Sequence, residues 1–272
     1  MDEYISDNKI AWESIAPIHS KGLVAKRERI INNECFIPIS DGIINYLSNI
    51  NVVSKTCLHL CCNNGFETIG LKRIGASECV GVDFCEYNIK HANELAQHLM
   101  ISDSVKFIQS NVTYSALPEL LGRKFDVIYI STGSLCWIEN LDMFYKNVYQ
   151  LLNPGGKVFI FDLHPMSNII NDNKQSDKDP MLIVNPYFSE KPITCCASLD
   201  YISRVSKEKQ KYHMFPHTLS AIIYTALKED LQLDFFDETE IDESGGFMRV
   251  SSQNLHFPLS FCMIFSKSIL ED

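Results

Sequence analysis

The chain has 272 residues, of which 46% are hydrophobic and 11% aromatic, and its 34 acidic residues exceed its 24 basic ones to give a formal net charge of −10. This length and composition favour one elaborated globular domain and exclude extensive disorder. The acidic balance argues against a broad nucleic-acid surface, because phosphate binding needs clustered Lys and Arg. We therefore expect a small-molecule partner and no nucleic acid.

The first nine residues, MDEYISDNK, are acidic and polar, whereas a signal peptide begins with basic and then apolar residues. No uncharged apolar run approaches the roughly 18 residues needed to span a bilayer. We expect a cytoplasmic protein that does not insert into membranes. Its ten cysteines form no CxxC pair, so we expect reduced thiols that mostly serve as small core residues, and no metal site.

Two residue periodicities alternate along the chain. Runs rich in β-branched and apolar residues indicate strands, and apolar residues three or four positions apart indicate helices. Ser40 and Gly75 provide a start and a stop for two of these helices, and Pro154-Gly155-Gly156 interrupts the chain ahead of a strand. The predicted elements, in chain order, are helix 40–50, strand 56–61, helix 66–73, strand 78–83, helix 86–100, strands 105–109 and 124–130, helix 141–152, strand 157–163, helix 217–230, and strands 231–239 and 256–266.

Strands that alternate with helices predict an α/β fold, a Rossmann-like doubly wound sheet with helices on both faces. We expect seven strands, mostly parallel, with the last two forming an antiparallel pair. The alternation fails after residue 164, where prolines recur and a polar stretch follows, which indicates an inserted lid. The expected divisions are an N-terminal helical cap at 1–50, a core at 51–164, the lid at 165–216, and a C-terminal completion of the sheet at 217–272.

Chemistry-bearing residues follow the first two predicted strands. The first strand leads into the turn CCNNG, which ends at Gly65, and Asp83 ends the second strand 18 residues later. A tight turn lets backbone N–H groups approach a ligand, and a carboxylate at the next strand end can accept hydrogen bonds from both hydroxyls of a ribose. The pattern indicates a nucleoside ligand at the carboxyl ends of the strands.

These residues resemble the class I S-adenosylmethionine-dependent methyltransferases, and more closely a bacterial subgroup with an LHLxC-type first motif. His59, Cys61 and Asn63 stand where the broader family has an acidic residue and two glycines, and Gly65 keeps the third glycine. The likeness covers most of residues 10–165. Its other matching segments are Trp12 with 16–20, 81–84, 125–129, 134–137, 151–157, 164–165 and His217.

The resemblance implies an enzyme that uses S-adenosylmethionine to methylate a small-molecule acceptor. It implies that the turn lines the methionine and ribose parts of the cofactor, that Asp83 binds the ribose hydroxyls with Phe84 against the adenine, and that Ser131 faces the methionine end. Asn111 and Val112 would contact the adenine edge. The full set of implied cofactor-binding residues is Cys61, Cys62, Asn63, Gly65, Asp83, Phe84, Asn111, Val112 and Ser131.

Residues for the acceptor are predicted from position. Trp12 and Trp137 are candidates for the wall of the substrate pocket, because large aromatic side chains often line such pockets. His19, His164 and His217 are the candidate catalytic residues, because an imidazole is a suitable general base near neutral pH. We expect a pocket bounded by the core, residues 12–20 and residues 165–217, with Trp137, His164 and His217 on its wall.

Several of these residues have a second, structural interpretation. Asp83 could be the N-cap of the helix that follows it, and Asp162 could satisfy nearby backbone donors rather than act as a base. His59 is expected to bond locally within its strand. The pairs at 61–62 and 195–196 could be redox-active or metalloid-binding thiols, but adjacent cysteines without other ligands are more often packing residues.

Two other function classes stay open. A module that binds S-adenosylmethionine or S-adenosylhomocysteine without turnover would share the fold and the turn. An NAD-dependent oxidoreductase would share the sheet and Asp83, but its GxGxxG turn needs glycines that Cys61 and Asn63 do not supply. The acceptor, the atom that would be methylated and the oligomeric state do not follow from the sequence.

Overall fold

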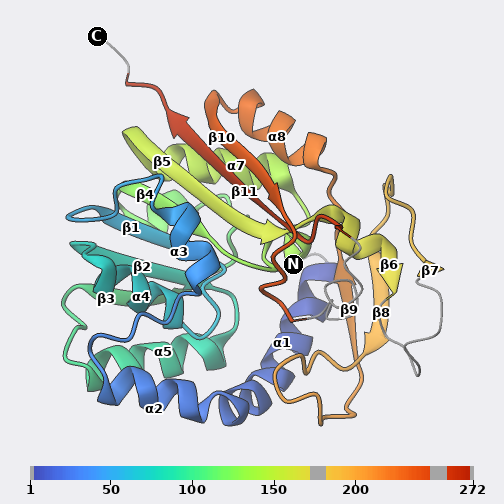
Figure 1. Ribbon diagram of the computed structural model, residues 1–272, viewed down its shortest axis with the longest axis horizontal. Helices are drawn as coiled ribbons and strands as arrows, with labels where there is room; N and C mark the ends of the chain where they lie inside the picture. Colours follow the sequence, from blue (N-terminus) through green and yellow to red (C-terminus); the bar gives the residue numbers. More distant parts are fainter. Residues whose placement is uncertain (1–2, 172–181, 246–255, 270–272) are drawn as a thin grey trace.

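The computed structural model describes residues 3–171, 182–245 and 256–269, and a seven-stranded sheet lies at its centre (Figure 1). The strand order is β10-β11-β5-β4-β1-β2-β3. Neighbouring strands from β5 to β3 are parallel, whereas β11 is antiparallel to both β5 and β10. The strands are β1 (Thr56–Leu60), β2 (Glu78–Asp83), β3 (Val105–Gln109), β4 (Phe125–Ile130), β5 (Leu152–Leu163), β10 (Leu231–Thr239) and β11 (Ser260–Lys267). The predicted Rossmann-like, mostly parallel sheet with an antiparallel last strand is confirmed.

Helices cover both faces of this sheet. Alternate residues of β4 point to opposite faces, so Val127 and Tyr129 join one hydrophobic cluster and Ile128 and Ile130 join the other. The first cluster is covered by α3 (Asp41–Leu47), α4 (Phe66–Ile74) and α5 (Glu86–His98). The second is covered by α6 (Leu117–Leu121), α7 (Leu141–Leu151) and α8 (Leu219–Lys228). The burial of both strand faces explains why β1 and β4 are almost continuously apolar.

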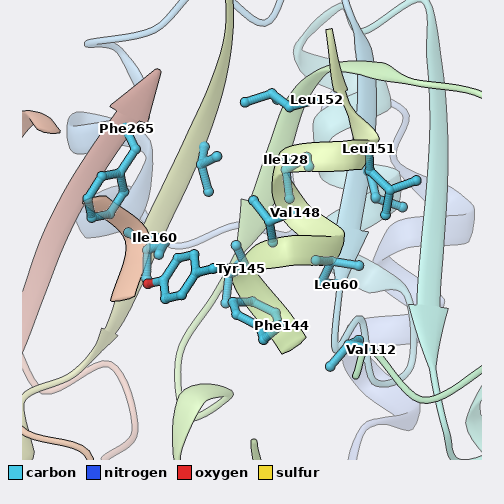
Figure 2. Packing of buried hydrophobic residues seen from close by; sticks show 14 of the residues in the cluster. Leu60, Val112, Ile128, Phe144, Tyr145, Val148, Leu151, Leu152, Ile160 and Phe265 are labelled. Carbon is cyan, nitrogen blue, oxygen red and sulfur yellow. The ribbon is translucent and has the colours of Figure 1, made fainter. Parts of the chain in front are cut away.

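Figure 2 shows how α7 packs on the sheet. Phe144, Val148 and Leu151, which recur at helical spacing, are fully buried or nearly so beside side chains of the strands. Asn140 starts this helix, because its side-chain oxygen accepts a hydrogen bond from the backbone N–H of Met143. The predicted helix over 141–152 therefore has both its position and its buried face confirmed.

Two helix boundaries that the sequence predicts from local signals are also present. The Ser40 hydroxyl accepts the backbone N–H of Ile43 and caps α3. Gly75 ends α4 with φ +119°, a left-handed conformation that a glycine adopts without strain. The predicted extension of α3 to residue 50 is wrong, since the helix ends at Leu47 and turns follow.

The predicted break at Pro154-Gly155-Gly156 is also wrong, because β5 begins at Leu152 and runs through these residues. The register between β4 and β5 shifts between Phe125 and Val127, so that extra residues of β5 are accommodated as an irregularity. Gly155 has φ +74°, which permits the local change of direction. Turn-forming residues therefore distort this strand without ending it.

Most of the remaining elements gather where β5 points, near the carboxyl ends of the parallel strands, whereas α2 runs alongside α5 (Figure 1). Two short antiparallel pairs, β6–β7 and β8–β9, lie within the predicted lid segment. These elements are α1 (Glu3–Gly22), α2 (Val24–Asn32), η1 (Leu135–Trp137), η2 (Pro165–Ile169), β6 (Ile170–Asn171), β7 (Leu182–Ile183), β8 (Ile193–Ala197) and β9 (Gln210–Met214). In the described part of the chain, no helix is both long and apolar enough to cross a membrane.

The hydroxyl of Tyr145 on α7 gives a test of this packing. It is fully buried and has no hydrogen-bond partner among the described residues. An unsatisfied buried hydroxyl costs about 1–3 kcal/mol, so we expect Tyr145→Phe to raise the free energy of unfolding by about 1 kcal/mol in urea titrations. Tyr46→Phe is the matched control, because its hydroxyl donates to Asp237 at 2.6 Å and its loss should destabilise the fold. A destabilised Tyr145→Phe would show that this hydroxyl has a partner in solution.

Candidate functional site

The turn after β1 has the backbone shape of a glycine-rich loop although it contains one glycine. Cys61 and Asn63 have φ +57° and +49°, in the left-handed backbone region that residues other than Gly, Asn and Asp rarely adopt. Gly65 has φ +75°, and a Cβ there would meet the ring of Phe107 at 2.4 Å. The backbone therefore follows a tight path even where side chains replace glycine.

Asp83 connects this turn to the next strand–helix junction. Its Oδ2 accepts the backbone N–H of Asn63 at 2.8 Å, and its Oδ1 accepts that of Cys85 at 2.9 Å. Burial raises the pKa of Asp83 to about 6 although these N–H groups stabilise the ionised form. An ionised carboxylate offers about four acceptor positions, so Asp83 retains capacity for further donors.

The other predicted cofactor residues follow β2, β3 and β4 at the same edge of the sheet. Phe84 is partly buried, and its carbonyl accepts the Gln109 amide at 3.2 Å. The Asn111 side-chain oxygen accepts the N–H and the hydroxyl of Thr113, which leaves its amide N–H groups as donors. Val112 is buried. The structure thus brings these residues to one sheet edge, and their contact with a cofactor stays a prediction.

A buried polar network joins β1, β4 and the start of α4. His59 Nδ1 lies 2.8 Å from the Thr68 hydroxyl, and its Nε2 lies 3.4 Å from the Ser131 hydroxyl. Burial lowers the pKa of His59 to about 3, so the ring is neutral. The Tyr129 hydroxyl donates to Glu67 Oε2 at 2.9 Å. Sequence reasoning missed Glu67, although its position two residues after Gly65, in the first turn of a helix, was an available signal.

Asp162, at the end of β5, organises the segment after β4. Its two oxygens accept the backbone N–H groups of Gly133, Ser134, Leu135 and Leu163. Burial raises the pKa of Asp162 to about 6, against the effect of these donors. The interpretation of Asp162 as an acceptor for backbone donors is confirmed.

Helix α1 covers the carboxyl ends of β1 and β2. Glu13 accepts the backbone N–H groups of Glu86 at 2.5 Å and Tyr87 at 3.2 Å, which caps α5 from outside. Asn8 exchanges two hydrogen bonds, of 2.8 and 2.7 Å, with the backbone of His213 in β9. The first helix is thus bound both to the core and to the segment after residue 165.

An aromatic cluster lies where α1, η1 and the predicted lid meet. The Trp12 ring packs at 5.3 Å from that of Trp137 and at 6.3 Å from that of Tyr201. The Tyr201 hydroxyl accepts the Asn63 side-chain amide at 3.3 Å. The segment after residue 165 therefore reaches the turn itself, and its role as a lid stays a prediction. Sequence reasoning found the two tryptophans and missed Tyr201.

The three candidate histidines occupy different environments. His19 Nε2 donates to the Leu199 carbonyl at 3.0 Å, and His217 Nε2 donates to the Ile138 carbonyl at 2.6 Å. Burial lowers the pKa of both, which favours neutral rings. His164 is engaged at both nitrogens, since Nε2 bonds to Glu238 at 2.7 Å and Nδ1 accepts the backbone N–H of Met166.

Two hollows adjoin this region. Residues 63–64 and His19 line one of them, between the turn and helices α1, α2 and α5. The other lies beyond β4 and β5, and its lining is Leu135, Cys136, Asp162, Leu163, Pro165, Asn168, Phe215, His217 and Ile222.

The predicted pocket wall of Trp137, His164 and His217 stays a prediction. His217 lines the second hollow, but Trp137 and His164 are absent from its lining. Trp137 instead packs against Trp12 and Tyr212. His164 is turned toward Glu238.

Comparison with known proteins gives a family match at the centre of the chain. Residues 58–160 match the family model described as a methyltransferase domain. The curated relatives include sterol 4-C-methyltransferase strm-1 of Caenorhabditis elegans, 30% identical over 45% of this chain and 35% of that protein. The mitochondrial ubiquinone biosynthesis O-methyltransferase of Rattus norvegicus is 35% identical over 36% of this chain and 28% of that protein. The chain thus spans about a third of the length of these relatives.

Solved structures support the fold over a longer stretch. A putative S-adenosylmethionine-dependent methyltransferase of Listeria monocytogenes superposes with a TM-score of 0.61 at 21% identity, covering 84% of this chain and 98% of that one. This likeness confirms the predicted fold. The use of S-adenosylmethionine by this chain stays a prediction. The resemblance to a bacterial subgroup stays a prediction.

The cap that Glu13 provides can be tested directly. Glu13→Ala removes both acceptors from the start of α5, and loss of such a cap costs about 1 kcal/mol. We expect that loss in the free energy of unfolding, with faster hydrogen exchange at the amides of Glu86 and Tyr87. Glu94→Ala, an exposed position on the same helix, is the matched control. Unchanged exchange at both amides would contradict the capping role.

Proposed function

We propose that this chain is an S-adenosylmethionine-dependent methyltransferase that acts on a small-molecule acceptor. The observation that carries the proposal lies inside the matched segment, where the Asp83 carboxylate and the Asn63 backbone form one hydrogen-bonded unit at the ends of β2 and β1. A nucleoside needs this combination of a close backbone turn and an adjacent carboxylate. The matched relatives named for sterols and ubiquinone support an acceptor of low molecular weight.

The residues present fit the cofactor. The left-handed backbone at Cys61 and Asn63 keeps the tight path of the turn, and Asp83 retains acceptor capacity for the ribose hydroxyls. The Thr132 hydroxyl, next to Ser131 at the end of β4, is buried without a hydrogen-bond partner among the described residues. A buried hydroxyl of this kind is stabilised by a ligand that supplies the missing hydrogen bond. Cys61, Cys62, Asn63 and Gly65 would hold the methionine and ribose parts, Asp83 the ribose hydroxyls, Phe84, Asn111 and Val112 the adenine, and Ser131 the methionine end.

The cofactor, when bound, supplies a methyl group that its sulfonium already activates. The protein's task is then to orient the acceptor in line with the carbon–sulfur bond and to exclude water. The aromatic cluster of Trp12, Trp137 and Tyr201, which closes α1 against the segment after residue 165, supports an enclosed reaction site. Residues 1–50 and 165–216 act in this proposal as a helical cap and a lid over the core.

A general base is needed only if the acceptor must lose a proton. His217 is the best placed of the three candidates, because it lines the hollow beyond β4 and β5 and its Nε2–H already has a partner, which leaves Nδ1 as the basic nitrogen. His19 has the same tautomer on the other side of the cleft. His164 is a weaker candidate, since both of its nitrogens are engaged.

Ligand-dependent thermal unfolding tests the proposal. A ligand at about 100 times its dissociation constant stabilises the native state by about 2.7 kcal/mol. We expect S-adenosylmethionine and S-adenosylhomocysteine to raise the melting temperature and NAD to leave it unchanged, because the turn suits a nucleoside and lacks the glycines of a dinucleotide site. Stabilisation by NAD alone would overturn the assignment. Binding without turnover on any acceptor would favour the non-enzymatic alternative.

The role of Asp83 predicts a pH dependence. Ribose hydroxyls donate to the ionised carboxylate, so cofactor binding should weaken as pH falls through the raised pKa of Asp83, about 6. Below that pH, we expect the affinity for S-adenosylhomocysteine in calorimetry to fall by up to about tenfold per pH unit. Asp83→Asn should abolish this dependence, which separates it from titration of Asp162. Asp83→Ala should weaken binding by about 1.5–3 kcal/mol at neutral pH, and an unchanged affinity would leave Asp83 as a helix cap only.

A further inference from the structure

The methionine end of the proposed cofactor carries positive charge, on an α-ammonium group as well as on the sulfonium. A cation held in a cleft of low dielectric needs a nearby carboxylate. Four acidic side chains of the described residues lie near the carboxyl ends of the central strands. They are Asp83, Asp162, Glu67 and Glu13, and Glu13 accepts the backbone N–H groups of Glu86 and Tyr87 at the start of α5. Their hydrogen bonds determine which of them can accept a ligand's ammonium group.

Like Glu13, Asp162 and Asp83 have other roles. Asp162 accepts four backbone N–H groups, which fills the acceptor capacity of a carboxylate. Asp83 is bound to the turn and to the start of α5, on the β2 side where the ribose is proposed to lie. His59, which stands where the resembling family has an acid, is neutral and bonds to Thr68.

Glu67 has a different set of partners. Its Oε2 accepts the Tyr129 hydroxyl at 2.9 Å, and the Ser131 hydroxyl is a second hydrogen-bonding partner of the carboxylate. Both partners are rotatable hydroxyls on β4 and the residue after it, and neither is a fixed backbone donor. The Glu67 side chain is partly buried.

The position of Glu67 also favours the ionised form. It lies in the first turn of α4, where the partial positive charge of the helix N-terminus stabilises an anion. Lys26 adds attraction and Glu243 opposes it. Burial raises the pKa of Glu67, and a bound cation would act in the opposite direction.

We propose that Glu67 is the carboxylate that binds the α-ammonium group of the cofactor's methionine moiety, with the hydroxyls of Tyr129 and Ser131 holding it in position. This inference rests on the proposed function, because it assigns a further residue to the same cofactor site. The resembling family has an acidic residue on the first strand, where this chain has His59. In this chain the carboxylate would instead come from Glu67, on the helix that follows the turn. Glu67 and Asp83 then bind two different parts of one ligand, the methionine moiety and the ribose.

The division between Glu67 and Asp83 is tested with ligands that differ only in the amino acid part. S-adenosylhomocysteine carries the ammonium group, decarboxylated S-adenosylhomocysteine keeps it, and methylthioadenosine lacks the whole moiety. In calorimetry we expect Glu67→Gln to weaken the binding of S-adenosylhomocysteine and of its decarboxylated form by at least about tenfold, equivalent to about 1.4 kcal/mol. The affinity for methylthioadenosine should be unchanged. Asp83→Ala should weaken all three.

Two further variants complete the experiment. Tyr129→Phe keeps the carboxylate and removes one hydroxyl that orients it. We therefore expect a smaller loss of affinity, again confined to the two ligands that carry the ammonium group. Glu78→Gln, at the opposite end of β2 in an exposed ion pair with Arg123, is the matched control and should change no affinity. Circular dichroism and melting temperature establish that each variant is folded.

The outcomes separate this inference from the proposed function. Equal weakening of all three ligands by Glu67→Gln would mean that Glu67 only supports the turn, and an unchanged affinity for S-adenosylhomocysteine would also overturn its assignment. If Glu67→Gln does not fold, the selectivity of Tyr129→Phe decides in the same way. Failure of the wild-type protein to bind any of the three would instead refute the proposed function.

Discussion

The hydrogen bond between the Asp83 carboxylate and the backbone N–H of Asn63 is the interaction on which the site depends. It joins the turn after β1 to the end of β2, and the second oxygen of Asp83 extends the connection to the start of α5. The constraint behind it is steric. The turn passes so close to β3 and α5 that a Cβ on Gly65 would meet Phe107 and Ala92. Local strain at Cys61 and Asn63 is thus maintained by the surrounding fold.

Much of the sheet could be predicted because its strands are short, apolar and separated by clear helical periods. The bounds of β2, β3 and β10 match the predicted ranges, and Ser40 and Gly75 act as the sequence indicated. The error at β5 has a physical cause. Pro-Gly-Gly favours a turn locally, but β5 pairs with β4 on both sides of these residues, at Leu152 and from Lys157 onward, so they form an irregularity within the strand. Pairing with a neighbouring strand overrides the local preference.

The contacts of the site were less predictable, because they join residues that are distant in sequence. Asn8 bonds to His213, and Asn63 bonds to Tyr201, across separations of 205 and 138 residues. No periodicity in one sequence encodes such pairs. Asp83 and Asp162 stood out because they end predicted strands, whereas the connection of Glu67 to Tyr129 required the packing of α4 on β4. The sequence thus shows which residues lie at strand ends, but it does not show which residues they hydrogen-bond to.

The position of β11 has a consequence for how the chain folds during its synthesis. This strand, formed by residues 260–267, lies between β5 and β10. Until it has been synthesised, β5 and β10 each have an unpaired edge where β11 will lie. On the ribosome, residues 152–163 emerge about a hundred residues earlier and present an open hydrogen-bonding edge throughout that interval. The nascent protein is therefore most exposed to strand-mediated aggregation late in translation. Insertion of β11 then pairs the open edge of β5 and the inner edge of β10 together, and β10 remains the edge strand of the sheet.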